Sequence, residues 1–481
     1  MLLNDIINGR DNDLAIIDQR RRFSYADFRS SVANARNTLY AVGVRQGDRV
    51  AIFSRNSAEF IFTYFAIASL GAIVVPINFQ LSPREIAFIV DDAAIDHIYT
   101  YQPLALDEYN DHVRQHDITV MGQADGSPDA PAIDPNFDEN SPVALVYTSG
   151  TTGSPKGATL SHKNLVTNVH QMRVMGCTAQ SKVLCVLPMY HCFGWTCAVL
   201  NSIYNGASIA IIRDVAPKST IDLIREEGIT DIYAVPPIYR LITKFAVKND
   251  LKTVRLALNG GTTIPEKIAN DFAERFGVVI VGGYGLSETS PVVTMSPPEE
   301  GRPISVGRVV PETEVRFVID GKDVPRGEVG ELFVRGGQVM LGYWNKPEAT
   351  AAVLDKDGWM HTGDLARIDE DGYVYIVDRL KEMIISMGEN IYPREVEEIV
   401  YNFPDIKEAA VIGVEDKIRG QACACYYSSK NGVVIDARAL KKFLQKNLAL
   451  YKVPREYHQL DELPHTATGK IFKRALTEAQ A

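Results

Sequence analysis

Short, nearly unbroken apolar runs recur along about the first 375 residues, and between them apolar residues return every three or four positions. Such runs are typical of parallel strands covered on both faces, and the wider spacing predicts amphipathic helices, as over 58–70 and 220–228. Together they predict an α/β fold with helices on both sides of mostly parallel sheets. The predicted strands are RVAIFS (49–54), AIVVPI (72–77), HIYTY (97–101), VALVYTS (143–149), SKVLCVLPM (181–189), SIAIIR (208–213), DIYAVPP (231–237), RLALNGG (255–261) and VVIVGGYG (278–285).

The pattern changes from about Thr313. Short runs separated by Gly, Asp and Pro turns predict a small β-rich subdomain, and after Asp378 a compact α+β unit follows. That unit begins with a helix over Pro393–Tyr401, which has Pro in its first turn and Glu residues after it. We therefore predict a large N-terminal domain over 1–377, a linker at 378–379 and a small C-terminal domain over 380–481.

One segment, residues 60–77, is an uncharged run near the lower length limit for crossing a membrane. It contains Gly71 and Pro76, so a buried helix to about Leu70, a glycine turn and a short buried strand explain it better. The N-terminus lacks the basic, apolar and small-residue regions of a secretory signal. We expect no transmembrane segment and a cytoplasmic protein.

Composition excludes some function classes. The chain has 481 residues and a formal net charge of −10, which argues against a nucleic-acid-binding protein. The six cysteines contain no C-x-x-C pair and are expected to be reduced thiols. Cys185, His191, Cys192 and Cys197 lie close in sequence, but their spacing fits no standard zinc pattern.

The stretch YTSGTTGSPKG (147–157) follows a predicted strand and concentrates phosphate-binding chemistry. Its three glycines let backbone N–H groups converge on an anion, its hydroxyls add donors, and Lys156 adds a positive charge. It is not the G-x-x-x-x-G-K-[ST] loop, because glycine follows the lysine.

A second polar turn, VVIVGGYGLSET (278–289), permits close approach of a ligand. It offers the flat face of Tyr284 to an adenine, a hydroxyl at Ser287 and a hard carboxylate oxygen at Glu288 for Mg²⁺. Two other residues are weak evidence for a binding site when each is taken alone. Asp364 in HTGDL is typical of a turn former, and Lys470 in a turn-rich segment is typical of a solvated surface charge.

In combination these segments resemble the adenylate-forming superfamily of acyl-CoA synthetases, aryl-CoA ligases, peptide-synthetase adenylation domains and luciferases. The resemblance covers nearly the whole chain, and it moves Asp364 and Lys470 into the predicted site. It implies ATP, Mg²⁺ and CoA as cofactors and a small carboxylic acid as substrate; an oligomer is compatible with it. The matching motifs, in order, are YTSGTTGSPKG, YGLSE, HTGDL, DRLK and TATGK.

The resemblance also implies individual roles. Thr148 and Glu288 hold Mg²⁺, and Ser287 lies near the α-phosphate, where the family more often has Thr. Asp364 clamps the ribose with support from Arg379. Further nucleotide-binding positions are Ser149, Gly150, Thr151, Thr152, Gly153, Lys156, Gly260, Gly261, Gly282, Gly283, Tyr284 and Lys381.

The implied chemistry has two steps. The substrate carboxylate attacks the α-phosphorus of ATP with Lys470 as the catalytic cation, and a thiol then attacks the acyl adenylate. Between the steps the small domain turns about Asp378 and presents Met387 and Gly388 to the thiol passage. Many relatives have Gly-Gly at these two positions, so Met387 is expected to narrow or shift the passage.

The segment PMYHCFGWTCAVL (188–200) is expected to border the acid pocket, with His191 beside the substrate carboxylate. It contains no basic residue, which disfavours a second carboxylate, and Trp195 matches a position that gates a fatty-acyl tunnel in some long-chain members. The sequence therefore favours a medium- to long-chain fatty acid. The alternatives are an aryl acid, an acyl-AMP ligase that loads a carrier protein, and an interaction protein with a vestigial site.

Overall fold

The computed structural model describes residues 1–106, 112–134, 136–148, 155–302, 304–387, 389–416, 419–465 and 471–478. The chain forms two compact units. The first contains Met1–Glu314 and Val334–Met360, and the second contains Val315–Phe333 and His361–Ala481. Each unit is described by itself below.

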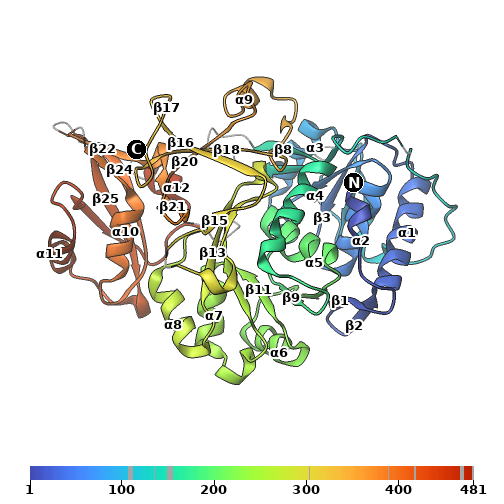
Figure 1. Ribbon diagram of the computed structural model, residues 1–481, viewed down its shortest axis with the longest axis horizontal. Helices are drawn as coiled ribbons and strands as arrows, with labels where there is room; N and C mark the ends of the chain where they lie inside the picture. Colours follow the sequence, from blue (N-terminus) through green and yellow to red (C-terminus); the bar gives the residue numbers. More distant parts are fainter. Residues whose placement is uncertain are drawn as a thin grey trace. The chain divides into compact units, whose positions relative to one another are not determined.

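The first unit contains a nine-stranded sheet in the order β15-β14-β13-β12-β11-β9-β10-β1-β2. The six strands from β13 to β1 pair in parallel, and the edges are antiparallel. Figure 1 shows α6, α7 and α8 side by side next to β11 and β13. The bounds are β1 (Leu14–Asp18), β2 (Arg21–Ser24), β9 (Lys182–Cys185), β10 (Ser208–Ile211), β11 (Asp231–Ala234), β12 (Leu256–Asn259), β13 (Ile280–Gly285), β14 (Val292–Met295), β15 (Arg308–Val309), α5 (Asn201–Tyr204), α6 (Pro217–Glu227), α7 (Pro236–Phe245) and α8 (Glu266–Phe276).

A second sheet of the same unit has seven strands in the order β19-β8-β7-β4-β3-β5-β6. Its strands β7, β4, β3, β5 and β6 are parallel neighbours, whereas β8 and β19 join antiparallel. The bounds are β3 (Arg49–Phe53), β4 (Ile73–Pro76), β5 (His97–Thr100), β6 (Arg114–Asp117), β7 (Pro142–Thr148), β8 (Lys156–Ser161), β19 (Gly342–Tyr343), α1 (Tyr25–Ala41), α2 (Ala58–Ser69), α3 (Pro83–Ala93), α4 (His162–Gln171) and α9 (Pro347–Ala351). Shorter 3₁₀ helices are η1 (Leu3–Ile6), η2 (Ile118–Val120), η3 (Met172–Met175), η5 (Lys248–Leu251), η6 (Ser287–Thr289) and η7 (Pro298–Glu300).

Helix α2 explains the long apolar run. It contacts β1 of one sheet and β3 and β4 of the other, and it is buried on all sides because apolar residues cover its whole circumference. The helix ends at Ser69, Gly71 takes a left-handed φ of 70°, and β4 follows, as predicted. No helix in the described part of the chain is long and apolar enough to cross a membrane.

The second unit opens with a β-rich sheet in the order β17-β16-β18-β20-β21, as the Gly, Asp and Pro turns predicted. Asp364, which taken alone is typical of a turn former, lies inside β20, where it pairs with Arg379 of β21. The backbone irregularity falls one position later, between Leu365 and Ala366. The bounds are β16 (Thr313–Ile319), β17 (Lys322–Asp323), β18 (Gly330–Gly336), β20 (Met360–Ile368), β21 (Val374–Arg379) and η8 (Leu380–Glu382).

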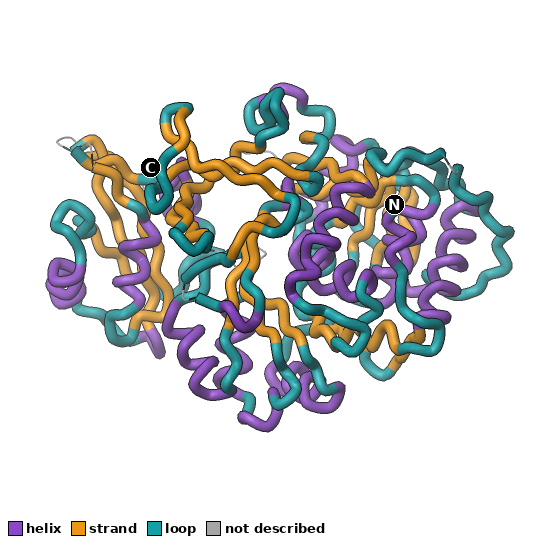
Figure 2. Tube along the Cα trace, viewed as in Figure 1, coloured by secondary structure: helices purple, strands orange, loops and turns teal. Residues whose placement is uncertain are grey.

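The C-terminal part of this unit is a sheet in the order β23-β22-β25-β24, with β26 parallel to β25 (Figure 2). Alternate residues of β24 face opposite sides. Val411 packs with α10 and α11, whereas Ile412 packs with Leu476 of α12. Helices on both faces explain why the middle of this strand, AAVIGV (409–414), is apolar. The bounds are β22 (Ile384–Ser386), β23 (Glu389–Ile391), α10 (Pro393–Tyr401), β24 (Ile406–Asp416), β25 (Gly420–Ser429), η9 (Lys430–Gly432), α11 (Ala437–Asn447), β26 (Glu456–Gln459) and α12 (Lys473–Glu478).

Both units confirm the predicted fold class: mostly parallel sheets with helices, a small β-rich part and a C-terminal α+β part.

Candidate active site

The predicted phosphate loop joins β7 to β8. Thr148, the last residue of β7, faces Lys156, the first residue of β8. The hydroxyl of the neighbouring Tyr147 donates a hydrogen bond to Asp92 Oδ2 at 2.7 Å. A Cβ on Gly157 would meet the Tyr147 ring at 3.1 Å. Close packing against this ring therefore favours glycine after the lysine. The predicted loop residues Ser149, Gly150, Thr151, Thr152 and Gly153 lie outside the described residues.

Tyr343 connects two of the predicted site residues, and sequence reasoning missed it. Its hydroxyl donates to Glu288 Oε1 at 2.8 Å, and the Lys156 ammonium lies 5.2 Å from its ring centroid. Burial, and then the Glu288 carboxylate, raise the pKa of Tyr343, so the hydroxyl stays protonated and donates. The strand β19, which carries Tyr343, is only two residues long, so the sequence pattern gave no indication that this tyrosine contacts Glu288 and Lys156.

The donor set at this point fits Mg²⁺. Glu288 and Thr148 offer carboxylate and hydroxyl oxygens, the hard ligands that this ion prefers. Glu288 Oε2 accepts no hydrogen bond from the residues that the structure describes. Within those residues no group of three or more His, Cys, Asp or Glu could hold a metal ion. Mg²⁺ held here would therefore take its other ligands from phosphate and water, as it does in many nucleotide sites.

The predicted adenine wall lies where β12 and β13 end. Asn259 of β12 pairs with Gly282 of β13, so the glycines that follow share one edge of the sheet. A Cβ on Gly282 would meet the Ser305 carbonyl oxygen at 2.1 Å, and one on Gly260 would meet Phe193 Cζ at 2.9 Å. Packing alone therefore favours glycine at positions 260 and 282. The wall comprises Gly260, Gly261, Gly282, Gly283 and Tyr284.

The segment after β9 was expected to be a loop, but from Phe193 to Leu200 it is the π-helix η4. His191 Nδ1 accepts a hydrogen bond from the Phe193 N–H at 3.2 Å, at the start of this helix. The helix is tied to η6 at two points. Cys192 Sγ lies 3.4 Å from Ser287 Oγ, and Thr196 Oγ1 donates to the Ser290 carbonyl at 2.9 Å.

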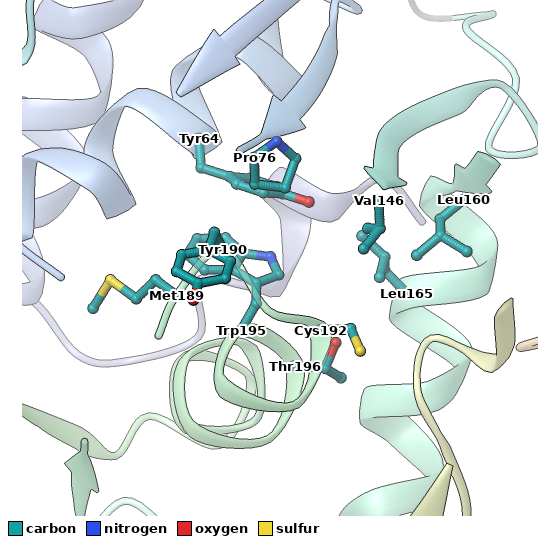
Figure 3. Close-up of a pocket in the computed structure, with 10 residues that line it drawn as sticks. All are labelled: Tyr64, Pro76, Val146, Leu160, Leu165, Met189, Tyr190, Cys192, Trp195 and Thr196. Atoms are coloured by element: carbon teal, nitrogen blue, oxygen red, sulfur yellow. The ribbon is translucent and has the colours of Figure 1, made fainter. Parts of the chain in front are cut away.

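A pocket lies beside this helix (Figure 3); the space between its lining atoms, open solvent included, is about 250 Å³. Trp195 lines it and stacks on Tyr64, with 3.9 Å between ring centroids and 29° between ring planes. Tyr190 also lines it, and its buried hydroxyl has no hydrogen-bond partner among the residues that the structure describes. Cys192 belongs to the lining as well, so the pocket adjoins Ser287, the predicted α-phosphate residue.

In the second unit the predicted ribose clamp is formed by two adjacent strands. Asp364 is 3% exposed, and its Oδ1 lies 3.2 Å from Arg379 Nε. The Asp364 N–H donates to Thr362 Oγ1 at 3.1 Å, which anchors the residue in the strand. Burial, and then the charge of Arg379, lower the pKa of Lys381 in η8. The structure thus brings Asp364, Arg379 and Lys381 together.

Comparison with known proteins decides the family. The model of the AMP-binding enzyme family matches residues 4–344, and that of the AMP-binding enzyme C-terminal domain matches residues 395–470. This chain belongs to the AMP-binding enzyme family. The resemblance seen in the motifs is therefore confirmed, and the chain is an adenylate-forming acid–thiol ligase that uses ATP.

Relatives in the AMP-binding enzyme family include a feruloyl-CoA synthase of Amycolatopsis, 36% identical over 94% of this chain and 92% of its own. An indoleacetate–CoA ligase of Aromatoleum aromaticum is 35% identical over 95% and 93%. A long-chain-fatty-acid–CoA ligase of Bacillus subtilis is 32% identical over 96% and 90%. Among solved structures, ATP-bound MatB from Rhodopseudomonas palustris is 28% identical with a TM-score of 0.93, covering 100% of this chain and 99% of its own.

Asp378, the predicted hinge residue, is buried near the end of β21. Its carboxylate accepts the Arg379 N–H at 2.7 Å and the N–H of Arg394, in the first turn of α10, at 3.0 Å. Burial raises its pKa. Met387 has a left-handed φ of 55° and is 64% exposed. Gly388 and Lys470 lie outside the described residues.

A half-buried ionic cluster, also missed from the sequence, lies in the C-terminal part of the second unit. Lys473 Nζ contacts Glu397 Oε1 of α10 at 2.8 Å and Glu382 Oε2 of η8 at 3.1 Å. The Glu397 Oε1 atom also accepts the Val411 N–H at 2.7 Å. Despite its burial, the carboxylates raise the pKa of Lys473. Lys473 thus ties α12, which begins three residues after Lys470, to η8 and α10.

Proposed function

We propose that this enzyme is a CoA ligase for a small aromatic carboxylic acid. The observation that carries the proposal is the pocket beside η4, which is lined by aromatic rings and adjoins Ser287. Two of the relatives above, the feruloyl-CoA synthase and the indoleacetate–CoA ligase, are named for aromatic acids.

The lining of the pocket favours such an acid, because it is mostly apolar and aromatic. The stacked rings of Tyr64 and Trp195 form a flat wall, against which an aromatic ring packs well. None of the described residues that line the pocket is charged, so none of them would pair with a second carboxylate.

A medium- to long-chain fatty acid is the second candidate. It was favoured by Trp195 in the sequence, and the B. subtilis relative is named for long-chain fatty acids. A long chain would need more room than the pocket encloses, so the stack of Trp195 on Tyr64 would have to open. Such aromatic pairs contribute about 0.5–1.5 kcal/mol beyond their burial, a modest cost that a long apolar chain could offset.

For the reaction itself we propose the roles that the motifs imply. Thr148 and Glu288 hold Mg²⁺, His191 lies beside the substrate carboxylate, and Lys470 is the catalytic cation. We also propose that 1–377 and 380–481 move about a hinge at 378–379, and that CoA enters past Met387 and Gly388. Bound Mg²⁺ would supply positive charge against the phosphates.

The experiment supplies the enzyme with ATP, Mg²⁺, CoA and a panel of cinnamic-type, arylacetic and fatty acids, and measures pyrophosphate and CoA thioester separately. We expect the highest kcat/KM with an aromatic acid. Fatty acids as the best substrates would contradict the proposal, and pyrophosphate release without any CoA thioester would favour a carrier protein as acceptor.

Trp195→Ala tests the pocket directly. Removing the indole lengthens the pocket, so the preference should move toward longer acids. Trp359→Ala is the matched control, because Trp359 is a buried tryptophan of the same unit that does not line this pocket. An unchanged preference in Trp195→Ala would contradict the placement of the acid.

A further inference from the structure

Hydrogen bonds hold the backbone around Tyr343, although its strand β19 is only two residues long. Its N–H donates to Thr350 Oγ1 at 2.9 Å, and the flanking Trp344 N–H donates to the Gly157 carbonyl at 2.8 Å. Gly342 has a φ of 136°, and a Cβ there would meet Thr350 Cγ2 at 2.7 Å. The strand is therefore locked against both β8 and α9.

The side chain extends from this fixed backbone to Glu288. The Tyr343 hydroxyl donates to Glu288 Oε1, and the Glu288 carbonyl accepts the Met340 N–H at 2.8 Å. One short segment thus holds Glu288 at its backbone and at one carboxylate oxygen. Oε2 is the carboxylate oxygen left for a cation.

The same ring faces Lys156, the lysine of the phosphate loop. Its ammonium lies 5.2 Å from the ring centroid, within the range of a cation–π contact. A single tyrosine thus contacts two charged groups, the Glu288 carboxylate and the Lys156 ammonium. A Mg²⁺–nucleotide complex would meet both of them.

We propose that Tyr343 is a positioning residue, whose hydroxyl orients Glu288 for the divalent cation and whose ring holds Lys156 beside that carboxylate. The inference rests on the proposed roles of Glu288 and Lys156 in binding Mg²⁺ and phosphate. It does not depend on which acid is the substrate, so it is tested by nucleotide binding without acid or CoA.

The first test is Tyr343→Phe, which removes the hydroxyl and keeps the ring. Equilibrium ATP binding is measured by calorimetry across a Mg²⁺ series. Loss of a residue that orients a metal ligand typically weakens metal affinity by about 10–100-fold, so the Mg²⁺ midpoint should rise by that factor. Tyr375→Phe is the control: it removes another tyrosine hydroxyl that donates to a carboxylate, that of Asp369 at 3.1 Å, and its Mg²⁺ midpoint should not move.

The second test separates the ring from the hydroxyl. Tyr343→Leu should bind ATP about 2–5-fold more weakly than Tyr343→Phe, the factor expected for an exposed cation–π contact. Lys156→Met provides a second measurement, because it should cost less in Tyr343→Leu than in the wild-type protein. Equal ATP affinity in Tyr343→Leu and Tyr343→Phe would overturn the role of the ring.

Glu288→Gln distinguishes failure of the inference from failure of the proposed function. If Glu288→Gln shifts the Mg²⁺ midpoint and Tyr343→Phe does not, the inference alone is overturned. If Glu288→Gln leaves the midpoint unchanged, the assignment of Glu288 as a cation ligand fails first. If both shift it, the double variant should be no worse than Glu288→Gln, because both act through one carboxylate.

Discussion

Lys473→Met should destabilise the second unit by removing the ammonium that joins a half-buried ionic cluster. Methionine keeps most of the length of the side chain but leaves the carboxylates of Glu382 and Glu397 facing each other without a cation. Removing one partner of a buried ion pair costs ~3–5 kcal/mol. Glu382 keeps 32% of its side-chain surface exposed, so we expect a loss near the lower end, about 3 kcal/mol.

The two units can be followed separately. All three tryptophans, Trp195, Trp344 and Trp359, belong to the first unit, so tryptophan fluorescence during urea unfolding reports on that unit. Hydrogen exchange of peptides from β24 and β25 reports on the second unit. A loss of about 3 kcal/mol should speed their exchange by about 100-fold, while the fluorescence transition stays near that of the wild-type protein.

Two further variants sharpen this test. Lys407→Met removes a lysine from an exposed pair with Glu462 at 3.8 Å in the same unit, and it should cost no more than about 1 kcal/mol. Adding Glu397→Gln to Lys473→Met should recover part of the loss, because the amide oxygen still accepts the Val411 N–H. Wild-type exchange rates in Lys473→Met would refute the reasoning.

The pH dependence of this cluster has a definite sign. The pKa of Glu382 is lowered, so its contribution is present above its ordinary pKa and is lost as pH falls through the folded-state value. The pKa of Lys473 is raised, so its contribution is complete below its ordinary pKa and is lost at higher pH. Asp378 acts in the opposite sense, because burial raises its pKa. The stability difference between wild type and Lys473→Met should therefore be largest near neutral pH and shrink in acid.

Two other predictions follow from single positions. Gly282→Ala should destabilise the first unit by about 1–3 kcal/mol, because its Cβ would lie 2.1 Å from the Ser305 carbonyl oxygen; a wild-type urea midpoint by tryptophan fluorescence would contradict the close packing. Asp378→Pro should fix φ at the proposed hinge, sparing adenylation and impairing thioester formation; pyrophosphate exchange and thioester yield measure the two steps, and equal losses would count against a hinge. Asp378→Asn is its control, because it removes the charge that accepts the Arg394 N–H and leaves φ free.

Strands buried on both faces were the easiest elements to predict. β4 and β10, for example, are short apolar runs whose bounds in the structure fall within two residues of the predicted ones. β2 was missed because its sequence, RRFS, is short and polar, although it pairs with the adjacent β1. The two-residue β19 was missed because its pairing depends on the distant β8 rather than on local hydrophobicity. The π-helix at Phe193–Leu200 was missed because an entirely apolar segment has no periodicity from which to infer a helix.

The sequence by itself determined the family and the chemical groups that it supplies, because glycines, hydroxyls, carboxylates and lysines in a fixed order are local properties of the chain. Only the tertiary structure decided how these groups are held. Tyr343 reaches Glu288 and Lys156 because β19 pairs with β8, and Lys473 lies between Glu382 and Glu397 because α12 packs on β24. These contacts join residues far apart in sequence, and their energies depend on burial and distance, which no local pattern encodes.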